Sequence, residues 1–198
     1  ILNIIQGTGL GGMEQSSFNL MKQMSSSGYE FTVLSLTETG RLKTHLDEIE
    51  VPCIGFEYKG PGGFLSYFNY KRVIKDSDPD AIMMTGISLV GMLALSNICK
   101  ENRILFVHYH HTGVKSNFLW RFLYYISMKK FKHIFFASRF IMEEALNISS
   151  RIKSKSTYLP NPLFPVDFKD SSNLNESRQS LGICDEDIVV GNAGWLIK

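Results

Sequence analysis

Short apolar runs alternate with longer segments of mixed polarity along most of the chain. Such runs, bounded by Gly, Pro or Asp, are typical of strands covered on both faces of a sheet, and the mixed segments between them are typical of helices. We predict strands at residues 1–5, 31–36, 53–58, 81–84, 103–110, 133–137 and 157–159. We predict helices at residues 13–27, 40–50, 64–75, 88–100, 117–130 and 138–147. This alternation predicts an α/β fold of the Rossmann-like type, a doubly wound and mostly parallel sheet with helices on both faces.

The pattern changes after Pro165, which suggests a domain boundary. Residues 166–176 are polar and charged and are typical of a linker. A short helix is predicted at residues 176–181, with Gly182 as its C′ glycine, and a new strand is predicted to begin at Asp187. We therefore predict one domain at residues 1–165, and a linker with the first strand of a truncated second domain at residues 166–198.

A glycine-rich turn joins the first strand to the first helix. Glycine lets the chain turn sharply and lets a ligand approach the backbone, and a helix start favours an anion. Gly7, Gly9 and Gly12, with Glu38 after the second strand, also match the dinucleotide-binding fingerprint G-x-G-x-x-G in outline. The turn is therefore interpreted as an anion-binding loop, a dinucleotide site or a tight turn without a ligand.

Charge and cysteine usage exclude some classes of protein. The formal net charge is only +2, so the overall charge gives little reason to expect binding to nucleic acid. The three cysteines are scattered and form no C-x-x-C pair, as in a reduced cytosolic protein. The chain shows no basic leader, and its longest weakly polar window, residues 86–98, is too short to span a bilayer. We expect a cytoplasmic protein.

Four polar ring side chains, His108, Tyr109, His110 and His111, follow one another at the end of a predicted strand. Alternation places His108 and His110 on one face, and the carboxyl end of a parallel strand opens toward a ligand crevice. A zinc site would need further ligands, and none is evident nearby. A buried histidine bonded to the backbone is the structural alternative.

The segment from Lys115 to Lys132 is both basic and aromatic. Such a composition is compatible with contact at a membrane surface. At helical spacing, however, the apolar residues fall all round the helix, which favours a buried helix with a basic end.

Several stretches in register resemble the N-terminal domain of GT-B glycosyltransferases of the family 4 type (glycosyl transferases group 1). The residues that carry the resemblance are Gly11-Gly12-Met13-Glu14, the stretch 28–36, the stretch 103–112 with its histidines, Ala137-Ser138-Arg139-Phe140-Ile141, Tyr158-Leu159-Pro160-Asn161-Pro162 and the stretch 190–196. The resemblance implies transfer of a sugar from a nucleotide-sugar donor to a hydroxyl acceptor, with retention and with no obligatory metal or other cofactor. It implies a role in the synthesis of glycans or cell-surface polysaccharide, with a sugar or lipid-linked acceptor and possible work at the inner face of the membrane.

The resemblance also implies roles for single residues. Gly9, Gly11 and Gly12 would form a loop near the donor phosphate. His110 best matches the active-site histidine of the family, with His108 second. Asn161 would lie in the hinge, and Trp195 stands where the family usually has an arginine that holds the donor diphosphate. The donor-binding half would lie mostly beyond the chain, so we expect the chain alone to be inactive and to bind nucleotide sugar weakly.

Two rival functions come from other classes. One is an NAD(P)-dependent Rossmann oxidoreductase that uses Gly7, Gly9, Gly12 and Glu38. The other is a non-enzymatic module that binds a membrane or a protein partner through the basic, aromatic helix.

Overall fold

The structure is a computed structural model of the chain, and it describes residues 1–9, 11–37, 39–56, 64–86, 95, 104–109, 117–162, 178–184 and 186–188. The contacts divide the chain into two compact units, Ile1–Leu163 and Phe164–Lys198. The predicted domain boundary at residue 165 stays a prediction.

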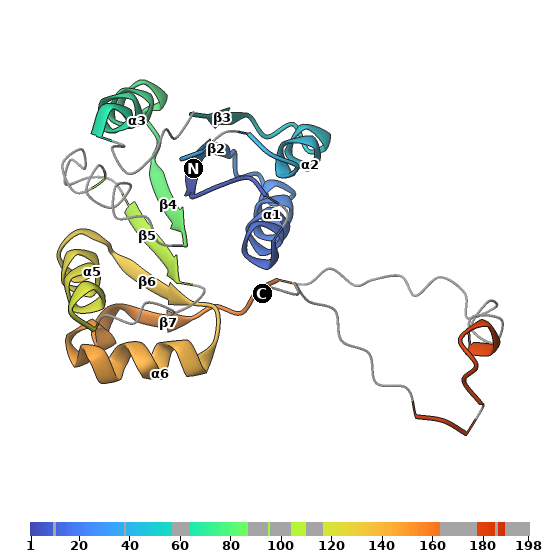
Figure 1. Cartoon of the computed structure of the whole chain (residues 1–198). Coiled ribbons are helices and arrows are strands. Elements are labelled where there is room, and N and C mark those ends of the chain that lie inside the picture. Colours follow the sequence, from blue (N-terminus) through green and yellow to red (C-terminus); the bar gives the residue numbers. More distant parts are fainter. Residues whose placement is uncertain are drawn as a thin grey trace. The chain divides into compact units, whose positions relative to one another are not determined.

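The first unit is built on a seven-stranded sheet in the order β3-β2-β1-β4-β5-β6-β7 (Figure 1). Each neighbouring pair of strands is parallel. The strands are β1 Leu2–Ile5, β2 Thr32–Ser35, β3 Cys53–Gly55, β4 Ala81–Thr85, β5 Ile104–Tyr109, β6 His133–Phe136 and β7 Ser156–Tyr158. The chain therefore winds outward from β1 to β3, returns to β4 beside β1, and winds outward again to β7. The predicted doubly wound parallel sheet is confirmed.

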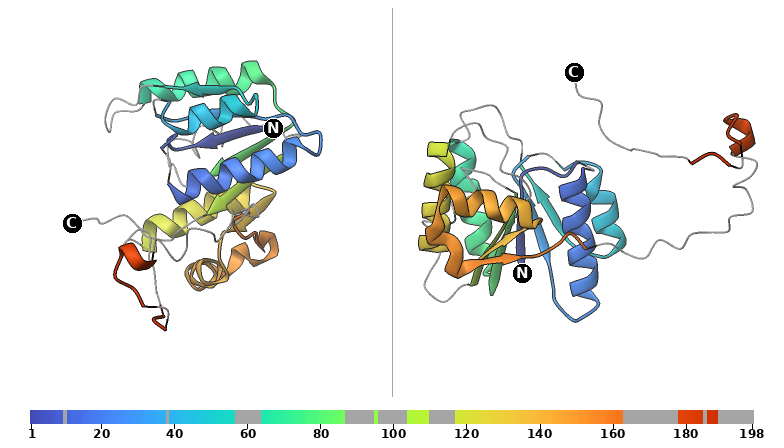
Figure 2. Two further views of the ribbon diagram at one scale, coloured as in Figure 1. Left: turned by 90° about the vertical axis from the view of Figure 1, so that its right-hand side faces the viewer. Right: turned by 90° about the horizontal axis from the view of Figure 1, so that it is seen from below.

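Helices cover both faces of this sheet (Figure 2). On one face, α1 (Gly12–Ser25) and α2 (Leu42–Glu48) enclose a core that includes Ile5 and Val33. On the other face, α3 (Phe64–Ser77), α5 (Asn117–Lys130) and α6 (Arg139–Ile148) enclose a larger core that includes Leu2 and Ile4. Successive side chains of a strand point to opposite faces, which explains why β1 contributes to both cores.

One element was missed at the sequence level. A 3₁₀ helix, η1 (Ser150–Lys155), links α6 to β7. Its residues are mostly polar, but Ile152 is fully buried in the larger core and holds the turn in place. Of the helix predicted at residues 88–100, Leu95 is helical and the others lie outside the described residues.

In the second unit, the described residues include a helical turn that ends at Gly182. This glycine has a φ of +69°, a conformation that residues with a Cβ rarely adopt. The N–H of Ile183 donates to the Arg178 carbonyl at 2.9 Å, and the N–H of Gly182 donates to the Gln179 carbonyl at 3.0 Å. These two bonds form a Schellman motif, so the predicted C′ glycine is confirmed. The predicted linker at residues 166–176 stays a prediction, because all of it lies outside the described residues.

Candidate functional site

The strand order defines where a ligand crevice is expected. Open parallel sheets bind ligands at the carboxyl ends of the strands, where the winding direction reverses. In this chain the reversal falls between β1 and β4. The glycine-rich loop follows β1, and Gly86 follows β4, so both lie at this point.

Gly86 brings the end of β4 and the first turn of α1 close together. It has a φ of +80°, and a Cβ built there would lie 2.6 Å from Sδ of Met13. Its N–H donates to the His108 carbonyl at 2.9 Å. A side chain at this position would be strained and would push against α1. Sequence reasoning missed Gly86, since one glycine after a strand carries no distinctive signal.

The glycine-rich loop is anchored at one point and open elsewhere. Thr8 is 1% exposed; its hydroxyl accepts a short hydrogen bond from the N–H of Gly40, and its carbonyl accepts one from the N–H of Leu42 at 3.0 Å. Gly9 and Gly12, in contrast, are exposed. The loop is therefore held against the start of α2 while its glycines remain at the surface.

The start of α1 is suited to an anion. Gly11 is the N-cap residue and offers no side-chain cap to the first turn. The N–H groups and the positive end of the helix dipole are therefore uncapped by a side chain there. Glu14 is the acidic residue of this turn, and its Oε2 would lie 2.6 Å from a Cβ on Gly11.

The open space around Gly12 argues against a dinucleotide-binding site of the G-x-G-x-x-G type. In that motif the third glycine permits close packing of helix against strand. A Cβ on Gly12 would meet nothing within 4 Å, so no close packing requires a glycine there. Glu38, the acidic residue of the same interpretation, lies outside the described residues.

A buried polar network fixes α1 to the sheet just below this loop. The amide of Asn3 in β1 donates to the Ser17 hydroxyl of α1 at 2.7 Å, and its Oδ1 accepts from the Thr85 hydroxyl of β4 at 3.0 Å. All three side chains are buried. The network joins the two strands that flank the reversal point to the helix that begins there. Sequence reasoning missed Asn3, which lies inside an apolar run.

His108 is buried at the end of β5, with 2% of its surface exposed. Its Nε2–H donates to the carbonyl of Leu159 at 3.2 Å. Burial lowers its pKa to about 4, and the bond to Leu159 opposes this shift only in part. The ring is therefore neutral at neutral pH. This arrangement is the buried histidine bonded to backbone, whereas His110 lies outside the described residues.

Residues 159–162, called the strap below, leave β7 and run across the end of the sheet to α1. The N–H of Leu159 donates to the Phe136 carbonyl of β6 at 3.0 Å, and the amide of Asn19 in α1 donates to the Pro162 carbonyl at 3.0 Å. Figure 1 shows this crossing (orange). Asn161 lies exposed on the strap. Its predicted hinge role stays a prediction, and Trp195 lies outside the described residues.

The sequence pattern favoured a buried helix with a basic end at this place. In the structure, however, the basic, aromatic helix α5 is buried on one side only. Trp120, Leu123 and Tyr124 of α5 are buried, whereas Phe118 and Tyr125 are 83% and 52% exposed. One side of α5 packs on the sheet and the other faces outward.

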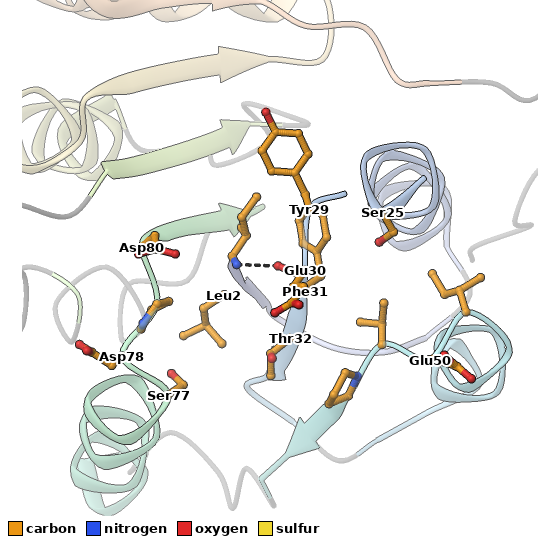
Figure 3. Close-up of a pocket in the computed structure, with 15 residues that line it drawn as sticks. Leu2, Ser25, Tyr29, Glu30, Phe31, Thr32, Glu50, Ser77, Asp78 and Asp80 are labelled. Atoms are coloured by element: carbon orange, nitrogen blue, oxygen red, sulfur yellow. Dashed lines mark hydrogen bonds between the residues drawn. The ribbon is translucent and has the colours of Figure 1, made fainter. Parts of the chain in front are cut away.

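A cavity of about 570 Å³ lies at the amino ends of the strands, at the end of the sheet opposite to the glycine-rich loop (Figure 3). It is bounded by the starts of β1 and β2 and by the segments that precede β3 and β4. Four carboxylates line it, on Glu30, Glu50, Asp78 and Asp80, and no lysine or arginine does. Such a lining repels an anionic ligand, so this cavity is not the phosphate site.

Neither a metal centre nor a membrane-spanning helix is present among the described residues. No group of three or more His, Cys, Asp and Glu side chains is placed to hold a metal ion within that part of the chain. In the same residues, no helix has both the length and the apolar character to cross a membrane.

The fold and the loop define the chain as a Rossmann-like α/β domain with an anion-compatible helix start at its reversal point. The chain belongs to Glycosyltransferase Family 4, whose model matches residues 10–163. No curated protein matches the sequence. Among solved structures, a glycosyltransferase from Rickettsia africae ESF-5 aligns with a TM-score of 0.73 and 14% identity, covering 93% of this chain and 50% of that one.

Two further solved structures share the fold. Anabaena Alr3699/HepE in complex with UDP-glucose aligns with a TM-score of 0.70 and 19% identity over 91% of this chain and 49% of that one. MurG from Acinetobacter baumannii aligns with a TM-score of 0.55 and 18% identity over 84% of this chain and 47% of that one. The chain thus spans about half the length of the solved structures that it matches.

Proposed function

We propose that the chain forms the acceptor-side half of an enzyme that transfers a sugar from a nucleotide-sugar donor to a hydroxyl group, with retention at the anomeric carbon. Family membership over residues 10–163 supports sugar transfer. The donor-binding half would begin in the second unit and continue in a longer protein. The Anabaena structure contains UDP-glucose, which makes this donor the first to test. Glycan or cell-surface polysaccharide synthesis is the proposed setting.

One observation carries the proposed mechanism: two glycines at an uncapped helix start, at the reversal point of the sheet. When the sugar leaves its donor, negative charge develops on the diphosphate, and positively directed N–H groups stabilise it. Gly12 leaves open space beside these groups, so that a phosphate or sugar oxygen can approach the backbone. In the proposal this loop faces the donor, and the basic side chains of the other half supply the remaining positive charge without a metal.

The histidines have different roles in this proposal. His110 contacts the transferred sugar or the acceptor. His108 is a positioning residue, because its ring is buried and holds the strap through the Leu159 carbonyl.

The test compares two glycine variants in the longer protein, with release of UDP from UDP-glucose as the measurement. Gly12→Val should lower turnover at least about tenfold, with an unchanged free energy of unfolding, because the added Cβ meets nothing within 4 Å. Gly40→Ala is the matched control. Its Cβ would lie 2.5 Å from the Thr8 carbonyl oxygen, so this variant should lose stability. Wild-type turnover in Gly12→Val would contradict the role of the loop.

Titrations of the 198-residue chain separate the rival enzyme class. Isothermal titration should show weak binding of UDP-glucose, since most of the donor site lies elsewhere. NADH fluorescence should not change on addition of the chain. Saturable NADH binding would instead favour the oxidoreductase.

A further inference from the structure

The outward side of α5 carries a row of exposed aromatic rings. Phe118, Phe122 and Tyr125 are 83%, 42% and 52% exposed, and they lie four and three residues apart, on one side of the helix. Large apolar side chains are common singly at protein surfaces, but a row of them marks an interaction surface.

Positive charge is concentrated in the same part of the chain. Residues 117–162 contain eight Lys or Arg and only two Glu, a formal charge of +6, although the whole chain carries +2. On α5 itself there is no acidic residue, and Lys129 lies over the ring of Tyr125, with Nζ 5.4 Å from its centroid. Within the described residues, neither Arg121 nor Arg151 forms an ion pair.

A groove of about 440 Å³ lies beside this row, between α5, the end of α6 and η1. Arg121 of α5 and Arg151 of η1 both line it, and Met128, Leu146 and Ile148 supply apolar surface. The two acidic residues of the region, Glu143 and Glu144, do not line it. The groove therefore pairs two guanidinium groups, which bind phosphate well, with an apolar wall.

We infer that this α5 surface, formed by Phe118, Arg121, Phe122, Tyr125, Lys129 and Arg151, binds the face of an anionic phospholipid bilayer. Aromatic rings insert at the level of the headgroups, and lysine and arginine attract anionic lipids. The groove accepts a lipid phosphate between its two arginines. A second copy of the chain fits less well, because a two-fold contact would bring like charges together. The inference does not depend on sugar transfer.

The test is sedimentation of the 198-residue chain with phosphatidylcholine vesicles, with and without phosphatidylglycerol. The chain should bind vesicles that contain phosphatidylglycerol and release them as salt is raised. The double variants Arg121→Glu/Lys129→Glu and Phe118→Ser/Phe122→Ser should each lower the bound fraction at least about tenfold. All four side chains are exposed, so circular dichroism should show an unchanged fold.

Two matched controls lie outside the surface. Phe140→Ser removes an aromatic ring that is 68% exposed at the start of α6. Arg41→Glu reverses an exposed charge beside α2, on the other face of the sheet. Both should bind within about twofold of wild type.

Three results would overturn the inference. The first is equal or absent binding to neutral and anionic vesicles. The second is wild-type binding by both double variants. The third, from analytical ultracentrifugation without vesicles, is a dimer that Phe118→Ser/Phe122→Ser dissolves, which would assign the surface to a second copy. No donor sugar is used, so a failure here is separate from a failure of the proposed enzyme activity.

Discussion

Replacing Asn3 by leucine should destabilise the first unit, although leucine is of similar volume and suits a strand. Asn3 is fully buried, and its side chain bonds Ser17 at 2.7 Å and Thr85 at 3.0 Å. Asn3→Leu leaves both hydroxyls buried without their partner. A buried polar group that loses its partner costs about 1–3 kcal/mol, so the expected loss for the two groups together is about 2–4 kcal/mol.

Removing the whole network should cost less than removing Asn3 alone. In Asn3→Leu/Ser17→Ala/Thr85→Val no unpartnered polar side chain remains, and Val closely matches Thr in shape. Replacement of all partners by apolar groups of like shape is often nearly neutral, so we expect a loss below about 1.5 kcal/mol. The triple variant should therefore be more stable than the single variant by about 1–2 kcal/mol, because the sites are strongly coupled.

The assay is urea unfolding followed by tryptophan fluorescence. The chain has two tryptophans, and Trp120 lies in the larger core of the first unit, so a Trp195→Phe background makes the signal specific to this unit. Circular dichroism gives a second probe of two-state behaviour. The reasoning would be refuted by a triple variant less stable than Asn3→Leu, or by a loss below about 1 kcal/mol in Asn3→Leu.

Two further predictions concern stability. The Oη of Tyr124 is buried with no hydrogen-bond partner among the described residues, so Tyr124→Phe should leave the urea midpoint unchanged or raise it. Tyr109→Phe is the control for Tyr124→Phe. It should lower the free energy of unfolding by about 1–2 kcal/mol, because it breaks the 2.6 Å hydrogen bond between Tyr109 and Ser127. An equal loss in the two variants would contradict the conclusion that the Tyr124 hydroxyl has no partner. Burial lowers the pKa of His108 to about 4, so between about pH 6.5 and pH 4 the unfolded chain binds a proton that the folded chain excludes, and stability falls as pH falls. At pH 5 the loss in the free energy of unfolding that His108 causes is about 2 kcal/mol. In His108→Gln, the free energy of unfolding should therefore fall by about 2 kcal/mol less between pH 7 and pH 5 than it does in the wild type. The same pH dependence in both proteins would rule out this effect of His108.

Much of the candidate site could be located from the sequence, but its working geometry could not. The glycine loop after β1 is a local signal, since glycines between a strand and a helix are visible in order along the chain. Gly86 and Asn3 gave no such signal, because their roles depend on Met13, Ser17 and Thr85, which reach them only through folding.

The histidines show the same limit. Alternation along a strand predicts that His108 and His110 share a face, but it does not tell what covers that face. The strap covers His108, and it comes from residues 159–162, some fifty positions later in the chain. Only that long-range packing turns His108 into a buried, neutral side chain.

The sequence by itself determined the class of fold, because short apolar runs and mixed helical segments are local patterns that fix which elements form. The sequence also determined the glycine-rich loop after β1 and the end of the helical turn at Gly182. Both depend on backbone freedom at single positions. The tertiary structure alone decided the strand order, the position of the reversal point and the outward side of α5. Apolar residues on all sides of α5 favoured a buried helix, but only one side meets the sheet, since α5 lies in an outer layer and has a face that no described element covers.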